Sequence, residues 1–330
     1  MKKNTPRRYP YLQIWDSNMN FNHKSVMLEE CMQGLNLKPD GVYFDGTLGG
    51  GGHSLEILKR TSPNGRLLAI DKDSDALMAA AERLSIFSDR ITYVHDDFKD
   101  AARHIDNYVP EGLDGAILDL GVSSYQIDTP ERGFSYVHDG MLDMRMNRTQ
   151  FLTAFNVVNE YTEYELARLI YTYGEEKFSR KIAAAIVKAR EKQSIRTTKQ
   201  LADIVTESIP MSARRTGGNP CKKTFQAIRI EVNGELEGLD KCIEEIALRL
   251  KKGGRMCVIT FHSLEDRIVK NTFKYLELDC ICDKSVSPIC TCGKVQEGIV
   301  ITKKPIEASE EELNDNRRSQ SAKLRIFERI

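Results

Sequence analysis

The sequence predicts an α/β protein in which a parallel sheet is interrupted by an all-helical insertion. Apolar, strand-like runs alternate with amphipathic helical segments up to residue 126, and the alternation resumes at residue 224. Several of these runs end in an aspartate, and the first is followed by four consecutive glycines. A strand, a glycine-rich turn and a helix in this order are typical of Rossmann-like folds, which bind nucleotide-type ligands.

The composition is that of an ordinary globular protein. The 330 residues suffice for two domains or for one domain with a large insertion, and 41% of them are hydrophobic. The 48 basic residues balance 48 acidic ones, so any contact with RNA must use local clusters of positive charge. No apolar run approaches the ~20 residues of a membrane helix, and no signal-type apolar core follows the first residues. We therefore expect a cytoplasmic protein without a membrane partner, with residues 1–20 as a flexible leader.

The glycine-rich turn is the first candidate site. Gly49 to Gly52 lie between a strand-like run that ends in Asp45 and a helical segment that begins near Leu55. Glycines in such a turn let the backbone approach a ligand, and the helix N-terminus offers unpaired N–H groups to it. A flexible linker is the alternative, although linkers are rarely placed between a buried strand and an amphipathic helix. The pattern Asp45-x-x-x-Gly49-x-Gly51 differs from the dinucleotide fingerprint G-x-G-x-x-G and is similar to the loop with which amino-group methyltransferases bind S-adenosylmethionine (SAM).

Three further strand-like runs, residues 65–71, 91–98 and 115–119, continue the pattern. Asp71 ends the first run roughly 20 residues after the glycines, where an acidic residue of Rossmann-like folds binds ribose hydroxyls. Asp119 ends the third run. Because ligands of open α/β sheets bind at the carboxyl ends of the strands, we expect these carboxylates to form a row along one edge of the sheet.

Helices are predicted just ahead of the first strand, at residues 25–34, and after the second strand, with an alanine-rich sequence, at 74–84. Phe98 follows a strand, where its ring could stack on adenine or could simply fill the core. After the insertion the α/β pattern resumes with a helix, a turn and a strand, predicted at residues 225–250, 251–254 and 255–261. His262 follows that strand and could act as a base or make a structural hydrogen bond.

Residues 127–223 are predicted to form an inserted helical domain for substrate recognition. Capping boxes at Thr162 and Thr197, together with the spacing of apolar residues, predict three helices, at residues 162–173, 175–192 and 197–210. The flanking segments, 21–126 and 224–330, would then form the ligand-binding core.

Two clusters of positive charge are candidates for phosphate contacts. The first is a glycine-containing loop with four cations, Arg214, Arg215, Lys222 and Lys223. The second is near the C-terminus and comprises Arg317, Arg318, Lys323 and Arg325. Each cluster could instead be solvated surface, and the sequence alone leaves both interpretations open.

Four cysteines occur as two C-x-C pairs in one short segment, Cys280, Cys282, Cys290 and Cys292. Four thiolates are the ligands of many structural zinc ions, but C-x-C is tighter than the usual C-x₂₋₄-C spacing. Four reduced thiols or a redox-sensitive loop are the alternatives. These possibilities stay open, and we predict no metal in the catalytic site itself.

Taken together, these motifs resemble the bacterial small-subunit ribosomal RNA cytosine-N4-methyltransferases, the RsmH or MraW family. The resemblance includes DGTLGGGGHS at 45–54 and FHSLEDR at 261–267. It is carried by eight stretches in all, residues 23–26, 45–54, 119–126, 131–135, 142–146, 224–230, 261–267 and 321–325. So many matches in the same order make the resemblance specific. Three residues depart from the family pattern and concern the substrate side, Met141, Asn147 and Asn219.

The resemblance implies an α/β, Rossmann-like SAM-dependent methyltransferase fold with an inserted all-helical domain. It implies SAM as the cofactor and methylation of the N4 atom of a cytosine, cytosine 1402, in the decoding region of 16S ribosomal RNA within the small ribosomal subunit. The SAM contacts that it implies are Gly51, Gly52, His53, Asp71, Phe98, Asp119 and Gln126.

Asp119 is also the candidate catalytic residue. The cytosine amino nitrogen is a poor nucleophile, so the enzyme has to flip the base out and hold this nitrogen in line with the methyl group. Related amino-methyltransferases accept from the amino group with an Asp or Asn that is followed by Pro-Pro and an aromatic residue, whereas Leu120 and Gly121 follow here. Asp119 could therefore serve the cofactor, the cytosine or both.

Two other functions stay open at this stage. The chain could be a SAM-dependent methyltransferase of a small molecule or a protein, or a non-catalytic RNA- or ribosome-binding protein that retains a nucleotide fold. The complete set of carboxylates and glycines disfavours the second of these. The sequence predicts no oligomeric state.

Overall fold

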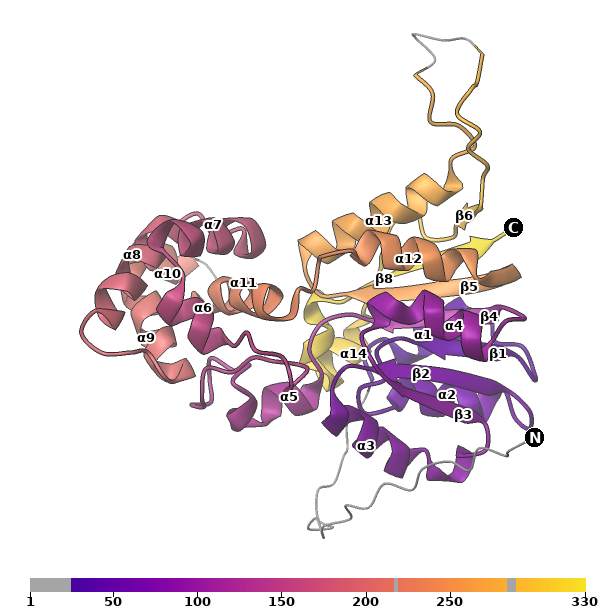
Figure 1. Cartoon of the computed structure of the whole chain (residues 1–330), viewed down its shortest axis with the longest axis horizontal. Helices are drawn as coiled ribbons and strands as arrows, with labels where there is room; N and C mark the ends of the chain where they lie inside the picture. The colour runs from indigo at the N-terminus through magenta and orange to yellow at the C-terminus, as the bar shows by residue number, and fades with distance from the viewer. Residues whose placement is uncertain (1–24, 217–218, 284–288) are drawn as a thin grey trace.

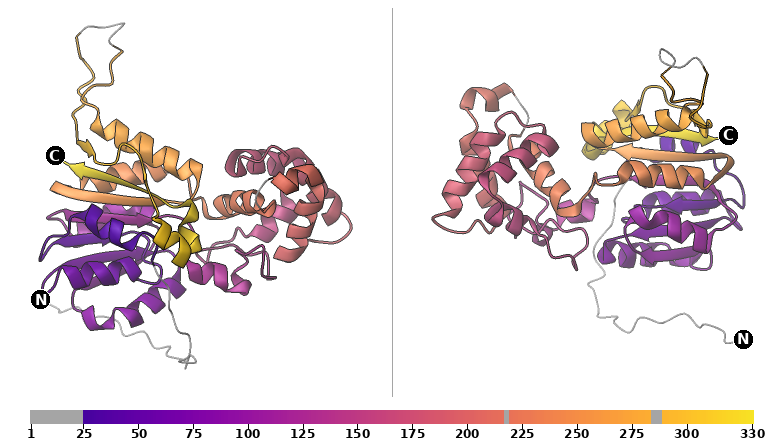
Figure 2. Two further views of the ribbon diagram at one scale, coloured as in Figure 1. Left: turned by 180° about the vertical axis from the view of Figure 1, so that it is seen from behind. Right: turned by 45° about the horizontal axis from the view of Figure 1, so that its top comes forward.

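The chain folds into a helix-covered sheet and, beside it, a body made only of helices (Figure 1; Figure 2). The computed structural model describes residues 25–216, 219–283 and 289–330. The expected leader and Gly217–Gly218 of the basic loop lie outside the described residues. Among the described helices, none is long and apolar enough to span a membrane.

Five parallel strands form the centre of the sheet, in the order β3-β2-β1-β4-β5. They are β1 Val42–Asp45, β2 Arg66–Asp71, β3 Ile91–His95, β4 Leu113–Asp119 and β5 Leu250–Thr260. The parallel sheet expected from the alternation of strands and helices is confirmed for these five strands. Beyond β5 the sheet continues with antiparallel strands that were not predicted, β6 Gly298–Val300, β7 Ile306–Glu307 and β8 Lys323–Arg329.

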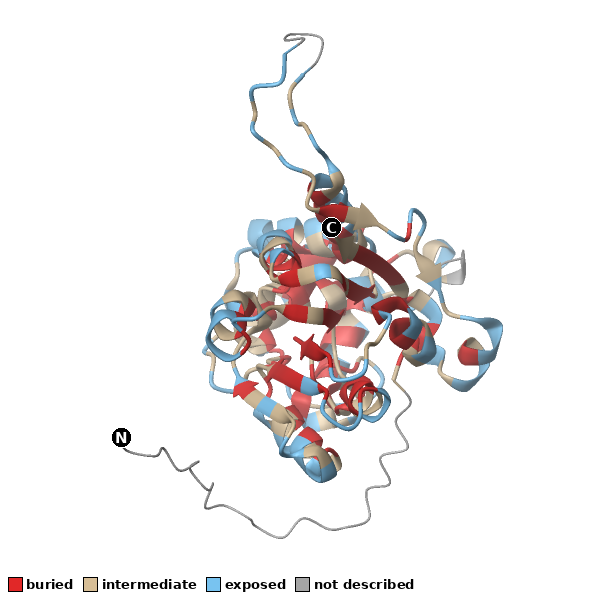
Figure 3. Cartoon of the chain, turned by 90° about the vertical axis from the view of Figure 1, so that its right-hand side faces the viewer, coloured by how far each residue is buried: buried red, intermediate tan, exposed pale blue. Residues whose placement is uncertain are grey.

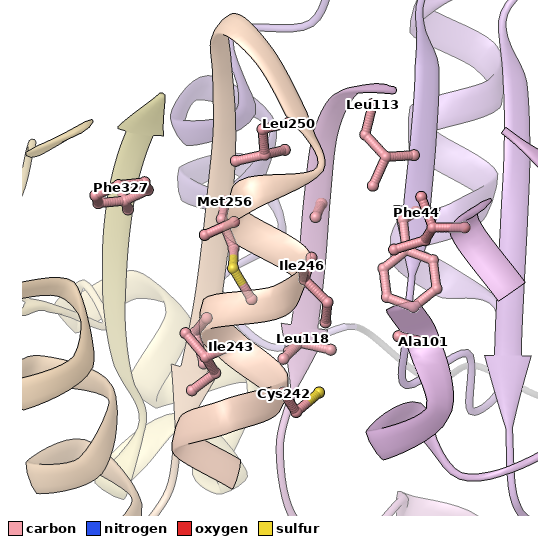
Figure 4. Close-up of a cluster of buried hydrophobic side chains, with 14 of the residues drawn as sticks. Phe44, Ala101, Leu113, Leu118, Cys242, Ile243, Ile246, Leu250, Met256 and Phe327 are labelled. Carbon is pink, nitrogen blue, oxygen red and sulfur yellow. The ribbon is translucent and has the colours of Figure 1, made fainter. Parts of the chain in front are cut away.

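Helices cover both faces of the sheet, as this fold class requires. Successive strand residues point to opposite faces, so Phe44 and Tyr43 of β1 enter different cores. The Phe44 face (Figure 4) is covered by α4 Ala101–Tyr108, α12 Leu239–Leu248 and α13 Ser263–Glu277. The Tyr43 face is covered by α1 Leu28–Leu35, α2 Gly52–Arg60 and α3 Ser74–Arg83. Buried residues are concentrated in the strands and in the helix faces turned towards them (Figure 3).

The helical body has its own buried apolar cluster. It is built from α6 Ala154–Glu160, α7 Glu163–Gly174, α8 Ser179–Arg190, α9 Thr198–Ser208, α10 Met211–Thr216 and α11 Cys221–Asn233. The capping boxes expected at Thr162 and Thr197 are both present. The cluster includes Val232 at the end of α11, so α11 packs with the inserted helices although the expected core resumes at residue 224. We propose Asn233 as the C-terminal limit of the insertion, and the division into domains otherwise stays a prediction.

The single helix predicted at residues 225–250 is wrong, because the chain forms α11 and α12 there, separated by residues 234–238. Gly234 ends α11 with φ +56° and Gly238 precedes α12 with φ +68°. This left-handed conformation favours glycine and stops a helix. The turn predicted at 251–254 lies within β5, where the register against β4 shifts. Shorter elements complete the fold: α5 Ser124–Asp128, α14 Glu310–Asp315, and the 3₁₀ helices η1 Ser85–Phe87, η2 Phe98–Asp100, η3 Pro130–Arg132 and η4 Arg317–Ser321.

Candidate functional site

A cavity of about 500 Å³ opens at the carboxyl ends of the parallel strands, between the sheet and the helical body. One part of its wall comes from the glycine turn and the ends of β2 and β4, and another from α5, α11 and η4. This is the edge at which open α/β sheets bind ligands, and the volume is in the range of small-molecule sites. The expected row of carboxylates meets the cavity at Asp71 and Asp119.

The glycine turn is held in shape by the sheet below it. Gly51 adopts φ +71° as the residue before α2, which therefore begins at Gly52 and not near Leu55 as predicted. Gly52 and His53 line the cavity, whereas Gly51 is not among the lining residues. Gly51 thus gives the turn its left-handed conformation next to the cavity, whereas Gly52 forms part of the cavity wall.

Asp45 supports the turn from beneath. Its side chain is buried, and its two carboxylate oxygens accept hydrogen bonds from the Ser54 hydroxyl (2.6 Å) and the Thr47 amide (3.1 Å). Burial raises the pKa of Asp45 to about 6. Asp45 is not a lining residue of the cavity, so it shapes the turn and does not reach a ligand there.

Asp71 is fixed at the cavity wall by two backbone N–H groups. The Gly49 amide donates to Oδ2 at 2.7 Å, and the Asp73 amide donates to Oδ1 at 2.9 Å. Burial raises the pKa of Asp71 to about 6, although these two hydrogen bonds favour the ionised form. Each oxygen retains a second acceptor site, so an oriented pair of hydroxyls could still donate to this carboxylate.

Asp119 lies at the end of β4 with one oxygen that no neighbour satisfies. Oδ1 is buried and has no hydrogen-bond partner among the described residues. Burial, together with the nearby carboxylates of Asp45 and Glu265, raises the pKa of Asp119 to about 8. The 27% of the side chain that stays accessible moderates this effect by admitting water. A buried carboxylate oxygen without a partner, in a cavity wall, is typical of a group that awaits a ligand.

His53 faces Asp119 as a neutral ring. Its Nε2 lies 3.0 Å from the carbonyl oxygen of Val26, which can only accept, so Nε2 carries the proton. Burial lowers the pKa of His53 to about 4, and the ring is therefore uncharged at neutral pH. Its unprotonated Nδ1 lies 3.9 Å from Oδ2 of Asp119. The two side chains form one wall of the cavity without a direct hydrogen bond.

Gln126 is held by a buried ion pair. Its side-chain amide donates to Oδ2 of Asp73 at 2.7 Å, and the same oxygen accepts from Arg132 Nη2 at 2.8 Å. Its carbonyl oxygen accepts from the Ser123 amide in the capping box of α5. Phe98, in η2 directly after β3, is half-buried and also lines the cavity. All the expected contact residues except Gly51 thus line the same cavity.

The end of the cavity beside α11 and α13 contains an ionic cluster. Arg229 of α11 makes two hydrogen bonds, of 2.9 and 2.8 Å, to the carboxylate of Glu235. His262 caps α13, where its Nδ1 accepts from the Glu265 amide at 3.4 Å. Burial raises the pKa of Glu265, but His262 and Arg229 outweigh this effect and hold the pKa below its usual value. These contacts support the structural interpretation of His262, whose Nε2 also lies 3.1 Å from Oε1 of Glu265.

The basic clusters contribute fewer cations to the cavity than the sequence suggested. Lys222, Arg317 and Arg318 line it, and Lys222 Nζ lies 3.3 Å from the Ser321 hydroxyl across the opening. Arg318 is paired with Asp128 at 2.7 Å. The expectation that Arg325 contacts phosphate is wrong, because Arg325 is 5% exposed and paired with Asp266.

Among the described side chains, three further expected cations, Arg214, Lys223 and Lys323, are not lining residues. Lys323 lies in β8, and Lys223 donates to the Glu175 carbonyl at 2.9 Å. Arg214 donates from Nε to the Ile209 carbonyl at 2.8 Å. The side chain of Arg215 lies outside the described part of the chain.

Several lining residues were not identified from the sequence. Phe134, Tyr136 and Phe225 form an aromatic wall, in which the Tyr136 and Phe225 rings meet edge to face with their centroids 5.6 Å apart. Gly46 and Thr47 also line the cavity, next to Gly49 of the predicted glycine-rich turn. Phe134 and Phe225 lie in stretches that carry the resemblance, 131–135 and 224–230, but their common position depends on how α11 packs beside the sheet.

Comparison with known proteins identifies close relatives. Residues 20–330 match the MraW methylase family. The "Ribosomal RNA small subunit methyltransferase H" of Lachnospira eligens is 52% identical over 312 residues, which cover 94% of this chain and 99% of that protein. The protein of the same name from Clostridium botulinum (strain Kyoto) is 54% identical, with coverage of 94% and 100%. Among solved structures, the N-methyltransferase NodS of Bradyrhizobium japonicum has a TM-score of 0.38 at 8% identity over 95% of this chain and 92% of that chain, a similarity too low to carry any argument.

Proposed function

The chain belongs to the MraW methylase family, and we propose that it uses the cavity at the sheet edge to methylate the N4 atom of a cytosine in 16S ribosomal RNA, cytosine 1402 by resemblance. It is a SAM-dependent methyltransferase. The observation that carries the assignment of the site is Asp119, whose side chain lines a cavity between the glycine turn and an aromatic wall and whose buried Oδ1 has no hydrogen-bond partner among the described residues.

The residues of the sheet edge suit SAM. Asp71 would accept hydrogen bonds from the ribose hydroxyls, because its carboxylate is oriented by two amides and keeps two acceptor sites. Phe98 would pack against the adenine ring. Gln126, Gly52 and His53 would complete the wall, and Gly51 would act by giving the turn its left-handed residue. When bound, SAM supplies the methyl group as an electrophilic sulfonium.

The helical body supplies groups that suit an RNA base. Tyr136 is partly exposed and offers a ring face against which a base turned out of its stack can pack. Lys222 and Arg317 are exposed cations at the rim, where they would contact phosphates on either side of that base. The cavity is thus bounded by SAM-type groups on the sheet and by RNA-type groups on α11 and η4.

Asp119 would act on the amino group of the cytosine. Its carboxyl group lines the cavity at the end of β4, with Oδ2 3.9 Å from the neutral ring of His53 and with Oδ1 unpaired among the described residues. In its ionised form it would accept from the amino hydrogens and stabilise the positive charge that develops on the nitrogen during transfer. The buried Arg132–Asp73 pair would act indirectly, because it positions Gln126.

We propose that the RNA is recognised within the small ribosomal subunit. The formal net charge is zero, and two cations at the rim would give little affinity for free RNA. The assembled subunit can make further contacts with the helical body through a surface of complementary shape. This substrate would place the protein in the cytoplasm, and the structure carries no proposal on the oligomeric state.

Methyl-group transfer from labelled SAM tests the function. Purified small subunits, protein-free 16S RNA and soluble proteins of a lysate are offered separately, and RNA products are digested to nucleosides for mass spectrometry. We expect N4-methylcytidine from small subunits, at one position. Label in protein would support the alternative methyltransferase function, and label in free RNA at an equal rate would contradict recognition of the assembled particle.

A further inference from the structure

The segment between α13 and β6 projects from the body of the protein (Figure 1; Figure 3). Its described residues, 278–283 and 289–297, contain no helix or strand. The apolar side chains Ile281, Ile289 and Val295 are 53%, 73% and 66% exposed. The described residues of the segment therefore form no apolar core that could fix its conformation.

Four cysteine sulfurs nevertheless converge within this segment. Cys280 Sγ lies 3.4 Å from Cys290 Sγ, and Cys290 Sγ lies 3.6 Å from Cys292 Sγ. The distances from Cys280 to Cys292 and from Cys282 to Cys290 are 3.9 and 4.0 Å. All four sulfurs lie within 4.8 Å of one another. Zinc–sulfur bonds of about 2.3 Å place the thiolates of a tetrahedral site about 3.8 Å apart, so these spacings suit a single ion.

Packing does not explain this convergence. The other four cysteines, Cys31, Cys221, Cys242 and Cys257, are buried in the cores, as free thiols usually are. The four of the projecting segment are exposed or only partly buried. Sulfurs at the surface gain little from contact with one another unless an ion or a covalent bond joins them.

The backbone around the sulfurs also suits thiolates. The Cys282 amide lies 3.3 Å from Cys280 Sγ, and the Ile281 amide lies 3.5 Å from Cys292 Sγ. Hydrogen bonds from backbone N–H groups to sulfur orient metal-bound thiolates and stabilise their charge. The tight C-x-C spacing thus places both cysteines of each pair on one centre and directs amides to two of the sulfurs.

We propose that Cys280, Cys282, Cys290 and Cys292 bind one structural zinc ion that ties together the two limbs of the projecting segment. Binding exchanges the thiol protons for the ion, which has four protein ligands and no open position. None of the four cysteines lines the cavity that contains Asp119, so the ion takes no part in methyl transfer. Its effect is to fix a segment that has neither secondary structure nor an apolar core.

Metal analysis of the full-length protein tests the proposal. The protein is purified under reducing conditions without added metal, and zinc, iron and copper are measured together with protein. The variants are Cys290→Ser, the double variant Cys282→Ser/Cys290→Ser, and Thr291→Ala as a control between the ligands that removes no sulfur. Circular dichroism and SAM binding report whether each variant is folded.

We expect about one equivalent of zinc in the wild type and in Thr291→Ala, and at most a tenth of that in the double variant. Cobalt(II) added to the metal-free protein should give the thiolate charge-transfer bands of a tetrahedral site, which the double variant should lack. A chelator should accelerate proteolysis within residues 279–296 of the wild type and of Thr291→Ala, but not of the double variant. Iron in place of zinc, four titratable free thiols without metal, or equal zinc in all variants would overturn the proposal. None of these readouts depends on methyl transfer, so they are independent of the proposed function.

Discussion

The amide of Gly49 donates to Oδ2 of Asp71 over 2.7 Å, which links the glycine turn after β1 to the end of the neighbouring strand β2. Two motifs that are 22 residues apart in the sequence therefore form one rigid wall. The Asp73 amide holds the second oxygen, so the carboxylate cannot rotate away from the cavity. This arrangement prepares Asp71 to recognise a pair of hydroxyls before any ligand arrives.

Replacing Asp71 should weaken SAM binding without unfolding the protein. Charge-assisted hydrogen bonds contribute about 1.5–3 kcal/mol each, so Asp71→Ala should reduce the affinity about tenfold or more by calorimetry. Asp71 lies at the end of a strand and outside the apolar core, so the fold should persist. Asp89→Ala, an exposed acid away from the cavity, is the matched control. Unchanged affinity in folded Asp71→Ala would remove Asp71 from the SAM site.

The carboxylate row was predictable because parallel strands end at a common edge. Asp71 and Asp119 each end a strand-like run. The alternation of strand-like and helical segments predicts that these strands are parallel, and both patterns can be read directly from the sequence. The unsatisfied oxygen of Asp119 was not predictable, since it depends on every neighbour that fails to reach it. Likewise, the chain after the insertion reads as one helix until the backbone conformation of Gly234 is known.

The charged and aromatic parts of the site depended on tertiary structure. Arg325 looks like part of a basic tail, but β8 pairs with β5 and buries its guanidinium against Asp266. Phe225 lines the cavity only because α11 packs with the helical body and reaches back to the sheet. A count of charges or aromatic residues along the chain contains no information on either contact.

The exposed cations at the rim should carry the salt dependence of subunit binding. Lys222→Gln/Arg317→Gln removes two expected phosphate contacts, so the slope of log K against log salt should become shallower by about 1–2. SAM affinity should not change. Lys59→Gln/Lys241→Gln removes two exposed charges that do not line the cavity and should leave the slope intact. Equal slopes in the two double variants would show that the rim is only solvated surface.

The buried ion pair between Arg132 and Asp73 should be important for stability. Both side chains are almost inaccessible, so Arg132→Met would leave the Asp73 carboxylate buried without its cation. Loss of one partner of a buried ion pair lowers the free energy of unfolding by about 3–5 kcal/mol. The loss should be smaller here, because the Asp75 amide and the Gln126 side chain still donate hydrogen bonds to Asp73.

Urea denaturation of three variants tests this. Arg148→Met, in which an exposed arginine that also pairs with Asp75 is lost, should change the stability by at most about 1 kcal/mol. Adding Asp73→Asn to Arg132→Met should recover part of the loss, because the buried charge is then gone. If Arg132→Met is as stable as Arg148→Met, the pair does not stabilise the fold.

The last prediction concerns the ionisation of Asp119. Its pKa of about 8 in the free protein lies above the ordinary value for an aspartate, so the folded protein holds a proton there at pH 7. The carboxylate is the form that can stabilise positive charge on the cytosine nitrogen. A bound sulfonium favours that form, so the pKa in the complex should lie below 8. The single-turnover rate at saturating SAM and saturating subunits should therefore rise with pH and level off by about pH 8.

Asp119→Asn should abolish this rise and lower the plateau rate by about 10²–10³, the usual loss when one preorganised group of this kind is removed. The substitution should not destabilise the protein. Because the pKa of Asp119 is raised in the folded state, ionisation opposes folding as pH increases, and the neutral amide removes that penalty. A low rate in a protein that is as stable as the wild type, or more stable, would thus mark a chemical role. A near wild-type rate once SAM is saturating would make Asp119 a cofactor ligand only, and an unchanged pH profile in Asp119→Asn would assign the titration to another group.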